Sequence, residues 1–478
     1  MATFAVENPA TRDQIAELED ADAEAVDRAV RAAQDAFPAW SELPGRTRGR
    51  IMHRIADLLE ERGPDLARLE STDNGRPLRE TSAQQDIISG WYRYFGGWTD
   101  KIEGATIPVE GPYLNYTERV PVGICAAITP WNHPLLIATK KIAPALACGN
   151  TVVVKPSELA PLSVIEFGRL ALEAGLPEGV LTVVTGQRDT GATLAGHPGV
   201  DRIDLTGSTA TGKAIMAQAA ASIKRVGLEL GGKAANIVFA DCDLHAAVQG
   251  ALFAGYIGQG QTCIAGARVL VERPILETFL RDFAGGAAAI RVGDPLAGGT
   301  QMGPQISGPA LERIEGYVTG AVDDGATLVV GGRRPDLDGT LAGGHFFTPT
   351  AVLTEDSTIA VAREEIFGPV VTVIPFAGED EAVEIANAVD FGLGAAVWTH
   401  DVTRAHRVSR RLRFGITWIN DYHRTDPASP WGGFKLSGLG RENGEEAIHM
   451  FTEVKSTWVR LAEPGPGWYE QDGPTRLN

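Results

Sequence analysis

Between residues 123 and 220, short apolar runs alternate with segments of helical character, and this alternation limits the possible folds more than any other feature. Repeated strand–helix–strand units form right-handed crossovers, so they predict a parallel sheet with helices on both faces. Such a sheet binds ligands at the carboxyl ends of its strands. The predicted strands lie at 123–128, 152–154, 181–184 and 203–205, and the main predicted helices begin at Pro134, Pro161 and Ser208.

Polar residues follow three of these predicted strands. Asn132 places a neutral amide after the first strand, although an asparagine that caps the next helix is an equal alternative. Lys155 and Glu158 follow the second strand, where they suit a ribose or a phosphate; a surface turn is the alternative. The segment Thr206–Gly212 begins a helix whose backbone N–H groups suit a pyrophosphate, but it lacks the Gly-x-Gly-x-x-Gly fingerprint.

Glu229 stands between two leucines and precedes two glycines and a lysine. Burial of a carboxylate in such a setting raises its pKa, as a general base that works near neutral pH requires. A structural glutamate held in a salt bridge fits the same fragment equally well.

Cys263 lies in a glycine-rich stretch, Gly258–Gly266, between a helical run and the predicted strand 267–272. Glycines let the backbone approach a ligand closely and leave the sulfur uncrowded, which suits an attacking nucleophile. A single cysteine is more often a small buried core residue. The stretch alone therefore does not decide between the two interpretations.

The first hundred residues have a helical pattern. Val26, Val30, Ala33 and Phe37 recur at helical spacing, and Pro38 is expected to end that helix. These apolar faces predict packing and not chemistry.

Beyond this region, 104–122 predicts an exposed hairpin that needs a partner strand. A new strand at 236–239 begins a second body of strands and helices, and 451–461 predicts a final strand. Within the second body, Glu364–Pro369 joins a carboxylate to an aromatic ring, as in either a surface turn or a contact to a sugar and a ring. The Pro/Gly-rich tail 462–478 has no period.

Composition excludes several classes of function. A net charge of −18 over 478 residues argues against nucleic acid as a partner. Four cysteines without metal-knuckle or Cys-x-x-Cys spacing predict no metal site and a reducing compartment. No apolar run reaches the roughly 18 to 20 residues that span a bilayer, and the first residues do not resemble an export signal. We therefore expect a cytoplasmic protein without membrane contact.

Seven motifs occur together in one order, and with them the chain resembles the NAD(P)-dependent aldehyde dehydrogenase superfamily from about Asn8 to Lys455. Each motif alone is weak, but the set is specific. The matched motifs are Thr129–Asn132, Lys155–Glu158, Gly207–Ser208, Glu229–Lys233, Gly260–Cys263, Glu365–Pro369 and Pro430–Gly433.

The resemblance implies an α/β fold with a Rossmann-like cofactor domain, an α/β catalytic domain and a small β oligomerisation element. Homodimers or homotetramers are usual in the family. The implied limits are 1–101 and 122–231 for the NAD-binding domain, 232–436 for the catalytic domain, 102–121 and 437–461 for the oligomerisation element and C-terminal return, and 462–478 for the tail.

The resemblance also implies the chemistry. Cys263 is similar to the nucleophile that attacks an aldehyde to give a thiohemiacetal, and Asn132 with the Cys263 backbone N–H would form the oxyanion hole. Glu229 resembles the base that activates Cys263 or the deacylating water. The implied NAD contacts are Ile128, Thr129, Pro130, Trp131, Lys155, Ser157, Glu158, Gly207, Ser208, Thr211, Leu230, Gly231, Glu365 and Phe367.

Two side chains bear on cofactor choice and product. A carboxylate at Glu158 accepts a ribose hydroxyl and repels a 2′-phosphate, so NAD is expected over NADP. Family branches that transfer the acyl group to coenzyme A typically lack the acid at Glu229. We therefore expect hydrolysis of the thioester to a free carboxylate.

The implied substrate channel departs from many relatives. His133 replaces an aromatic residue and Lys140 replaces a tryptophan, so an aromatic box for a trimethylammonium group is incomplete. Lys140 and Arg424 favour an aldehyde with a remote carboxylate; the alternatives are that Asp421 and Asp426, nearby in sequence, offset this charge, or that the lysine simply reaches solvent. The channel prediction comprises His133, Lys140, Thr262, Tyr422 and Glu442.

Two other functions remain as alternatives. A cysteine hydrolase would use Cys263 without a cofactor, but no histidine lies near Cys263 in sequence. A binding protein that kept only the fold is the second alternative, and the joint presence of Cys263, Glu229 and Asn132 argues against it.

Overall fold

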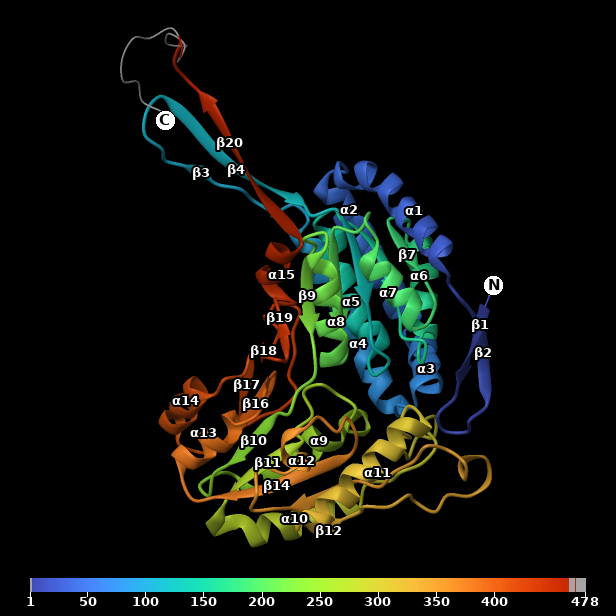
Figure 1. Cartoon of the computed structure of the whole chain (residues 1–478), viewed down its shortest axis with the longest axis vertical. Helices are drawn as coiled ribbons and strands as arrows, with labels where there is room; N and C mark the ends of the chain where they lie inside the picture. Colours follow the sequence, from blue (N-terminus) through green and yellow to red (C-terminus); the bar gives the residue numbers. More distant parts are fainter. Residues whose placement is uncertain (1, 464–468, 470–478) are drawn as a thin grey trace.

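The computed structural model describes residues 2–463 and 469, and its α/β architecture confirms the predicted fold class (Figure 1). The first sheet has the strand order β19-β9-β8-β5-β6-β7. Its strands β5 to β9 are parallel, and β19 joins β9 in the antiparallel sense. The strands are β5 (Ile124–Ile128), β6 (Thr151–Lys155), β7 (Leu181–Val183), β8 (Arg202–Thr206), β9 (Arg225–Glu229) and β19 (Gly438–Leu439).

Helices cover both faces of this sheet because its strands are apolar on both sides. Cys125 and Ala127 of β5 face one core, whereas Ile124 and Ala126 face the other. The first core is formed with α2 (Gly45–Glu61), α3 (Gly63–Asn74), α4 (Leu78–Trp98), α5 (Pro134–Ala147), α6 (Leu162–Glu173) and α15 (Gly444–Met450). The second is formed with α1 (Ala23–Ser41), α7 (Arg188–Gly196) and α8 (Thr209–Ala220).

Two predictions for the N-terminal region are wrong. Helix α1 continues through Pro38 to Ser41, because Pro38 lies in the last turn and its carbonyl still accepts from Glu42 N–H (3.1 Å). Residues 2–20 form a hairpin of β1 (Ala2–Glu7) and β2 (Gln14–Asp20), not helix. A turn in which the N–H of Asn8 donates to the carbonyl of Asp13 (2.9 Å) joins the two strands.

The second sheet has the order β12-β13-β14-β11-β10-β16-β17, in which only the β12–β13 pair is antiparallel. It confirms the predicted second body of strands and helices. Its strands are β10 (Ala235–Val238), β11 (Arg268–Glu272), β12 (Thr327–Val330), β13 (Thr350–Leu353), β14 (Val370–Phe376), β16 (Gly394–Trp398) and β17 (Ile416–Ile419). Its helices are α9 (Leu244–Tyr256), α10 (Leu276–Ala288), α11 (Gly308–Asp323), α12 (Ala360–Arg363), α13 (Glu379–Asn387) and α14 (Val402–Arg411). Short elements are 3-10 turns η1 (Ile257–Gly260), η2 (Arg273–Ile275) and η3 (Gly339–Leu341), and the pair β15 (Phe391–Gly392) with β18 (Phe434–Lys435).

A three-stranded arm projects from the body of the molecule (Figure 1). It consists of β3 (Thr106–Ile107), β4 (Tyr113–Pro121) and β20 (Thr452–Arg460), so the predicted hairpin and final strand are confirmed. The return segment 437–461 is divided, because β19 lies in the first sheet and β20 in the arm. Most of the predicted tail, 464–468 and 470–478, lies outside the described residues. Among the described helices, none combines the length and apolar character needed to cross a bilayer.

Candidate active site

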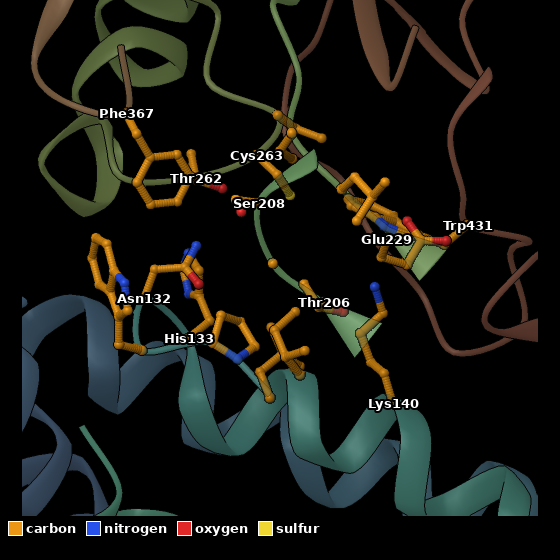
Figure 2. Close-up of a pocket in the computed structure, with 18 of the residues that line it drawn as sticks. Asn132, His133, Lys140, Thr206, Ser208, Glu229, Thr262, Cys263, Phe367 and Trp431 are labelled. Carbon is orange, nitrogen blue, oxygen red and sulfur yellow. The ribbon is translucent and has the colours of Figure 1, made fainter. Parts of the chain in front are cut away.

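A cavity of about 250 Å³ lies between the two sheets (Figure 2). Residues that follow β5, β8 and β9 line it from the first sheet, and residues that precede β11 and β14 line it from the second. The carboxyl ends of one sheet therefore face the amino ends of the other. Predicted site residues that line the cavity are Pro130, Trp131, Asn132, His133, Lys140, Gly207, Ser208, Glu229, Leu230, Gly231, Thr262, Cys263, Glu365 and Phe367.

Cys263 follows a tightly wound turn. Gly258, Gln259 and Gly260 have φ angles of 57°, 60° and 70°, a left-handed conformation that favours glycine. The thiol is half-buried and lines the cavity, unlike Cys125 and Cys148 in the core. Burial raises the pKa of Cys263 to about 12, and the Lys140 ammonium acts in the opposite direction. The resting thiol is therefore protonated, and its attack requires a base.

Asn132 points its amide toward the cysteine loop. Its Nδ2 donates to the carbonyl oxygen of Gln261 (2.8 Å), which leaves one amide hydrogen for a ligand. Its backbone is held by Asn74, whose Nδ2 contacts the carbonyl oxygens of Trp131 (3.4 Å) and Asn132 (3.3 Å). The capping alternative is wrong, because the residue at the N-cap of α5 is His133.

Glu229 is buried at the end of β9, and its Oε2 has no hydrogen-bond partner among the described residues. No ion pair within the described part of the chain holds it, so the salt-bridge alternative is not observed. Burial, followed by the charge of Glu442, raises its pKa to about 8, while Lys140 and Lys141 oppose this shift. The pKa of Glu229 thus lies in the range that a general base working near neutral pH requires.

A buried cluster of charges lies beside Glu229. Glu442 accepts ion pairs from Lys141 (2.7 Å) and Lys140 (3.0 Å), and the Lys140 ammonium lies 4.0 Å from the centre of the Trp431 ring. Burial opposes ionisation of Glu442, but Lys141 and Lys140 outweigh it and lower the pKa of that carboxyl. Lys140 is only 3% exposed, so the alternative that it reaches solvent is wrong.

The other predicted channel residues separate into two groups. His133 and Thr262 line the cavity, and Nδ1 of His133 contacts Oε1 of Gln84 (2.7 Å). Tyr422 and Glu442 are buried behind its wall. The Tyr422 hydroxyl donates to the carbonyl of Ile264 (2.8 Å), so it supports the cysteine loop.

Glu365 and Phe367 approach the cavity from the second sheet. Oε1 of Glu365 accepts from the N–H of Gly232 (2.9 Å), and burial raises the pKa of this carboxyl to about 7. Phe367 has a φ of +56°, rare for a bulky residue, and its ring meets Trp131 edge-on with centroids 5.2 Å apart. The strained backbone holds this aromatic pair at one end of the cavity.

The remaining predicted cofactor residues lie at the carboxyl ends of the first sheet, beyond the cavity lining. Nζ of Lys155 contacts Oε2 of Glu158 (3.4 Å), and Ser157 accepts from the N–H of Leu159 (3.3 Å). At the start of α8, Ser208 accepts from the N–H of Thr211 (3.2 Å). Ile128 ends β5 and Thr129 follows it.

Three threonines in this region have buried hydroxyls without a partner among the described residues. They are Thr129, Thr206 and Thr209. Unpaired polar groups of this kind are costly unless a ligand completes them. Together with the Lys155–Glu158 pair and the start of α8, they fit a dinucleotide.

Sequence reasoning missed several lining residues. Leu136 and Ile137 lie on the α5 face that also carries His133 and Lys140, so the spacing of three or four residues was an available signal. Trp91, His423 and Thr425 come from distant segments and give no local signal. Thr206 and Trp431 fall within segments that the sequence analysis singled out but did not assign to the site, and Ile264 and Arg313 complete the lining.

Comparison with known proteins agrees with this geometry. Residues 1–457 match the aldehyde dehydrogenase family. Human retinal dehydrogenase 2 is 43% identical over 96% of this chain and 89% of its own length. The structure of PnpE from Pseudomonas sp. WBC-3 in complex with nicotinamide adenine dinucleotide is 44% identical, covers 98% of this chain and 96% of that chain, and has a TM-score of 0.96. Betaine aldehyde dehydrogenase from Staphylococcus aureus in complex with NAD+ is 39% identical, with coverage of 98% and 94% and a TM-score of 0.96. The chain belongs to the aldehyde dehydrogenase family and is an oxidoreductase that acts on aldehydes.

Proposed function

We propose that this enzyme oxidises an aldehyde to the carboxylic acid with NAD through a covalent bond to Cys263. The observation that carries the proposal is the convergence of Cys263, Asn132 and Glu229 on one cavity between the two sheets. These residues supply a nucleophile, an oxyanion donor and a base, which acyl-forming chemistry at a carbonyl requires.

The reaction begins when Cys263 loses its proton and its sulfur bonds to the aldehyde carbon. The carbonyl oxygen becomes an alkoxide, which the free amide hydrogen of Asn132 and the N–H of Cys263 stabilise. Loss of hydride from this carbon gives a thioester, which water cleaves to the acid and the free thiol. Glu229 accepts the proton of Cys263 or that of the attacking water, consistent with its raised pKa.

NAD, when bound, supplies the acceptor for that hydride. Lys155 and Glu158 would hold the adenosine ribose, and Gly207 and Ser208 the pyrophosphate. Glu365 and Phe367 would hold the nicotinamide ribose and ring. Because Glu158 would face the ribose 2′ position, we propose a preference for NAD over NADP.

The test measures NADH formation with a panel of aldehydes and identifies the product with and without coenzyme A. We expect NADH and a free acid in both cases. Release of product without NADH would favour the cysteine hydrolase, and NAD binding without turnover would favour a binding protein. A Cys263→Ala variant that retains NADH formation would refute the assignment of the nucleophile.

We also propose that the chain self-associates through its arm as a homodimer or homotetramer. The arm exposes four apolar side chains, Leu114, Val454, Trp458 and Leu461. Exposed apolar side chains on projecting strands indicate a surface that another protein chain covers. Light scattering should give a multiple of the chain mass, and a Trp458→Glu variant should lower it. The four free cysteines support a reducing, cytoplasmic location.

A further inference from the structure

The active-site cavity adjoins a larger one of about 850 Å³, and the two share His133, Leu136, His423 and Thr425 as lining residues. None of the residues assigned to the cofactor lines the larger cavity. The larger cavity is therefore the approach by which an aldehyde can reach the inner cavity, where Cys263 and Lys140 both lie, without crossing the cofactor residues.

The charged residues that line the larger cavity are mostly cationic. Arg76 forms ion pairs with Glu70 (3.3 Å) and with Glu80 (3.5 Å). Glu80 is itself a lining residue of this cavity. Arg79 has no ion-pair partner within the described residues, and Arg424 is exposed with Asp421 at 3.2 Å. Arg79 is therefore the cation of this lining that remains free, within the described residues, to attract an anionic ligand.

Lys140 places a positive charge at the inner cavity, which Cys263 also lines. Its ammonium lies over Trp431 and shares Glu442 with Lys141, so two buried cations have one carboxylate between them. A buried excess of charge is costly, and an incoming anion would offset it. Figure 2 shows the Lys140 side chain rising from α5 toward Glu229 and Trp431.

On the basis of the proposed function, we propose that the substrate is an aldehyde with a carboxylate at the far end of its chain. Lys140 binds that carboxylate in the inner cavity while Cys263 attacks the aldehyde carbon, and Arg79 at the larger cavity attracts the incoming anion. Because Glu442 is already shared by two lysines, Lys140 retains donor capacity for a second carboxylate. The substrate carboxylate takes part in no covalent step.

The first experiment compares kcat/KM, at saturating NAD, for succinate, glutarate and adipate semialdehydes and for their methyl esters. We expect at least one acid to exceed its ester by about tenfold, and added salt to reduce that preference. Esters that equal or exceed their acids at every chain length would overturn the inference. Failure to oxidise either series or any simple aldehyde would instead overturn the proposed function.

The second experiment compares Lys140→Met with Arg68→Met, which removes an exposed charge on α3 that lines neither cavity. Lys140→Met should lower the acid-to-ester ratio of kcat/KM by about tenfold, and Arg68→Met should leave it unchanged. Lys140→Arg should retain the preference. If Lys140 only positions Glu442 and Glu229, its loss would lower acid and ester equally, which would overturn the inference. Wild-type selectivity decides the question even if Lys140→Met does not fold.

Discussion

Replacement of Glu229 by glutamine tests the base assignment most directly. The raised pKa, about 8, means that roughly a tenth of the carboxyl is ionised at about pH 7. If the ionised form acts, wild-type activity should rise about tenfold per pH unit below about pH 8 and then level. The variant should lose this rise, and its plateau should fall by a factor of about 10² to 10⁴.

The sign of the pH dependence follows from the neighbouring charges. Glu442 raises the pKa of Glu229, whereas Lys140 and Lys141 lower it. Glu442→Gln removes the anion and frees both lysines, so the midpoint of the activity profile should move to lower pH. A midpoint that moves upward would contradict this charge assignment.

Rapid mixing decides which proton Glu229 accepts. If Glu229 serves the attacking water, Glu229→Gln should keep an initial burst of NADH and lose steady turnover. If it serves Cys263, the burst itself should slow. A variant with the wild-type pH profile and wild-type burst would refute a base role altogether.

Three further outcomes are expected. Asn132→Ala should lower kcat by a factor of about 10² to 10³ through loss of an oxyanion donor, measured at saturating substrate. Gly260→Ala should lower the melting temperature, because its Cβ would lie 2.2 Å from the Gly368 carbonyl oxygen and φ is +70°; Gly285→Ala, with open space, is the control. Glu158→Ala should raise KM for NAD and narrow the difference between NAD and NADP, seen in parallel titrations.

The first half of the site was accessible from the sequence because strand ends of one parallel sheet meet at one edge. Asn132 and Ser208 follow neighbouring predicted strands, so strand–helix alternation predicts that they lie together. Glu229 ends β9, a strand that the sequence analysis did not predict. Cys263 and Glu365 come from the second sheet. No local pattern indicates which ends of two sheets face each other, and only the family resemblance joined these residues to the rest.

Long-range packing explains the predictions that failed. The pattern of residues 2–20 gave no strand signal, and the hairpin depends on a turn at Asn8. The family resemblance placed Tyr422 in the channel, and its hydroxyl donates to the carbonyl of Ile264 behind the cavity wall. Glu442 forms ion pairs with Lys140 and Lys141, which lie some 300 residues away in the sequence, so no local sequence pattern reveals this contact.

The glycines of the site serve contact between chain segments that carry site residues more than approach to a ligand. A Cβ on Gly231 would lie 2.2 Å from Oε2 of Glu365, and one on Gly232 would lie 2.3 Å from the carbonyl oxygen of Cys263. Gly260 meets the backbone of Gly368 in the same way. Since each contact joins segments that carry site residues, a side chain at any of the three would displace the thiol or Glu365. The position of the nucleophile therefore depends on these close contacts at the three glycines.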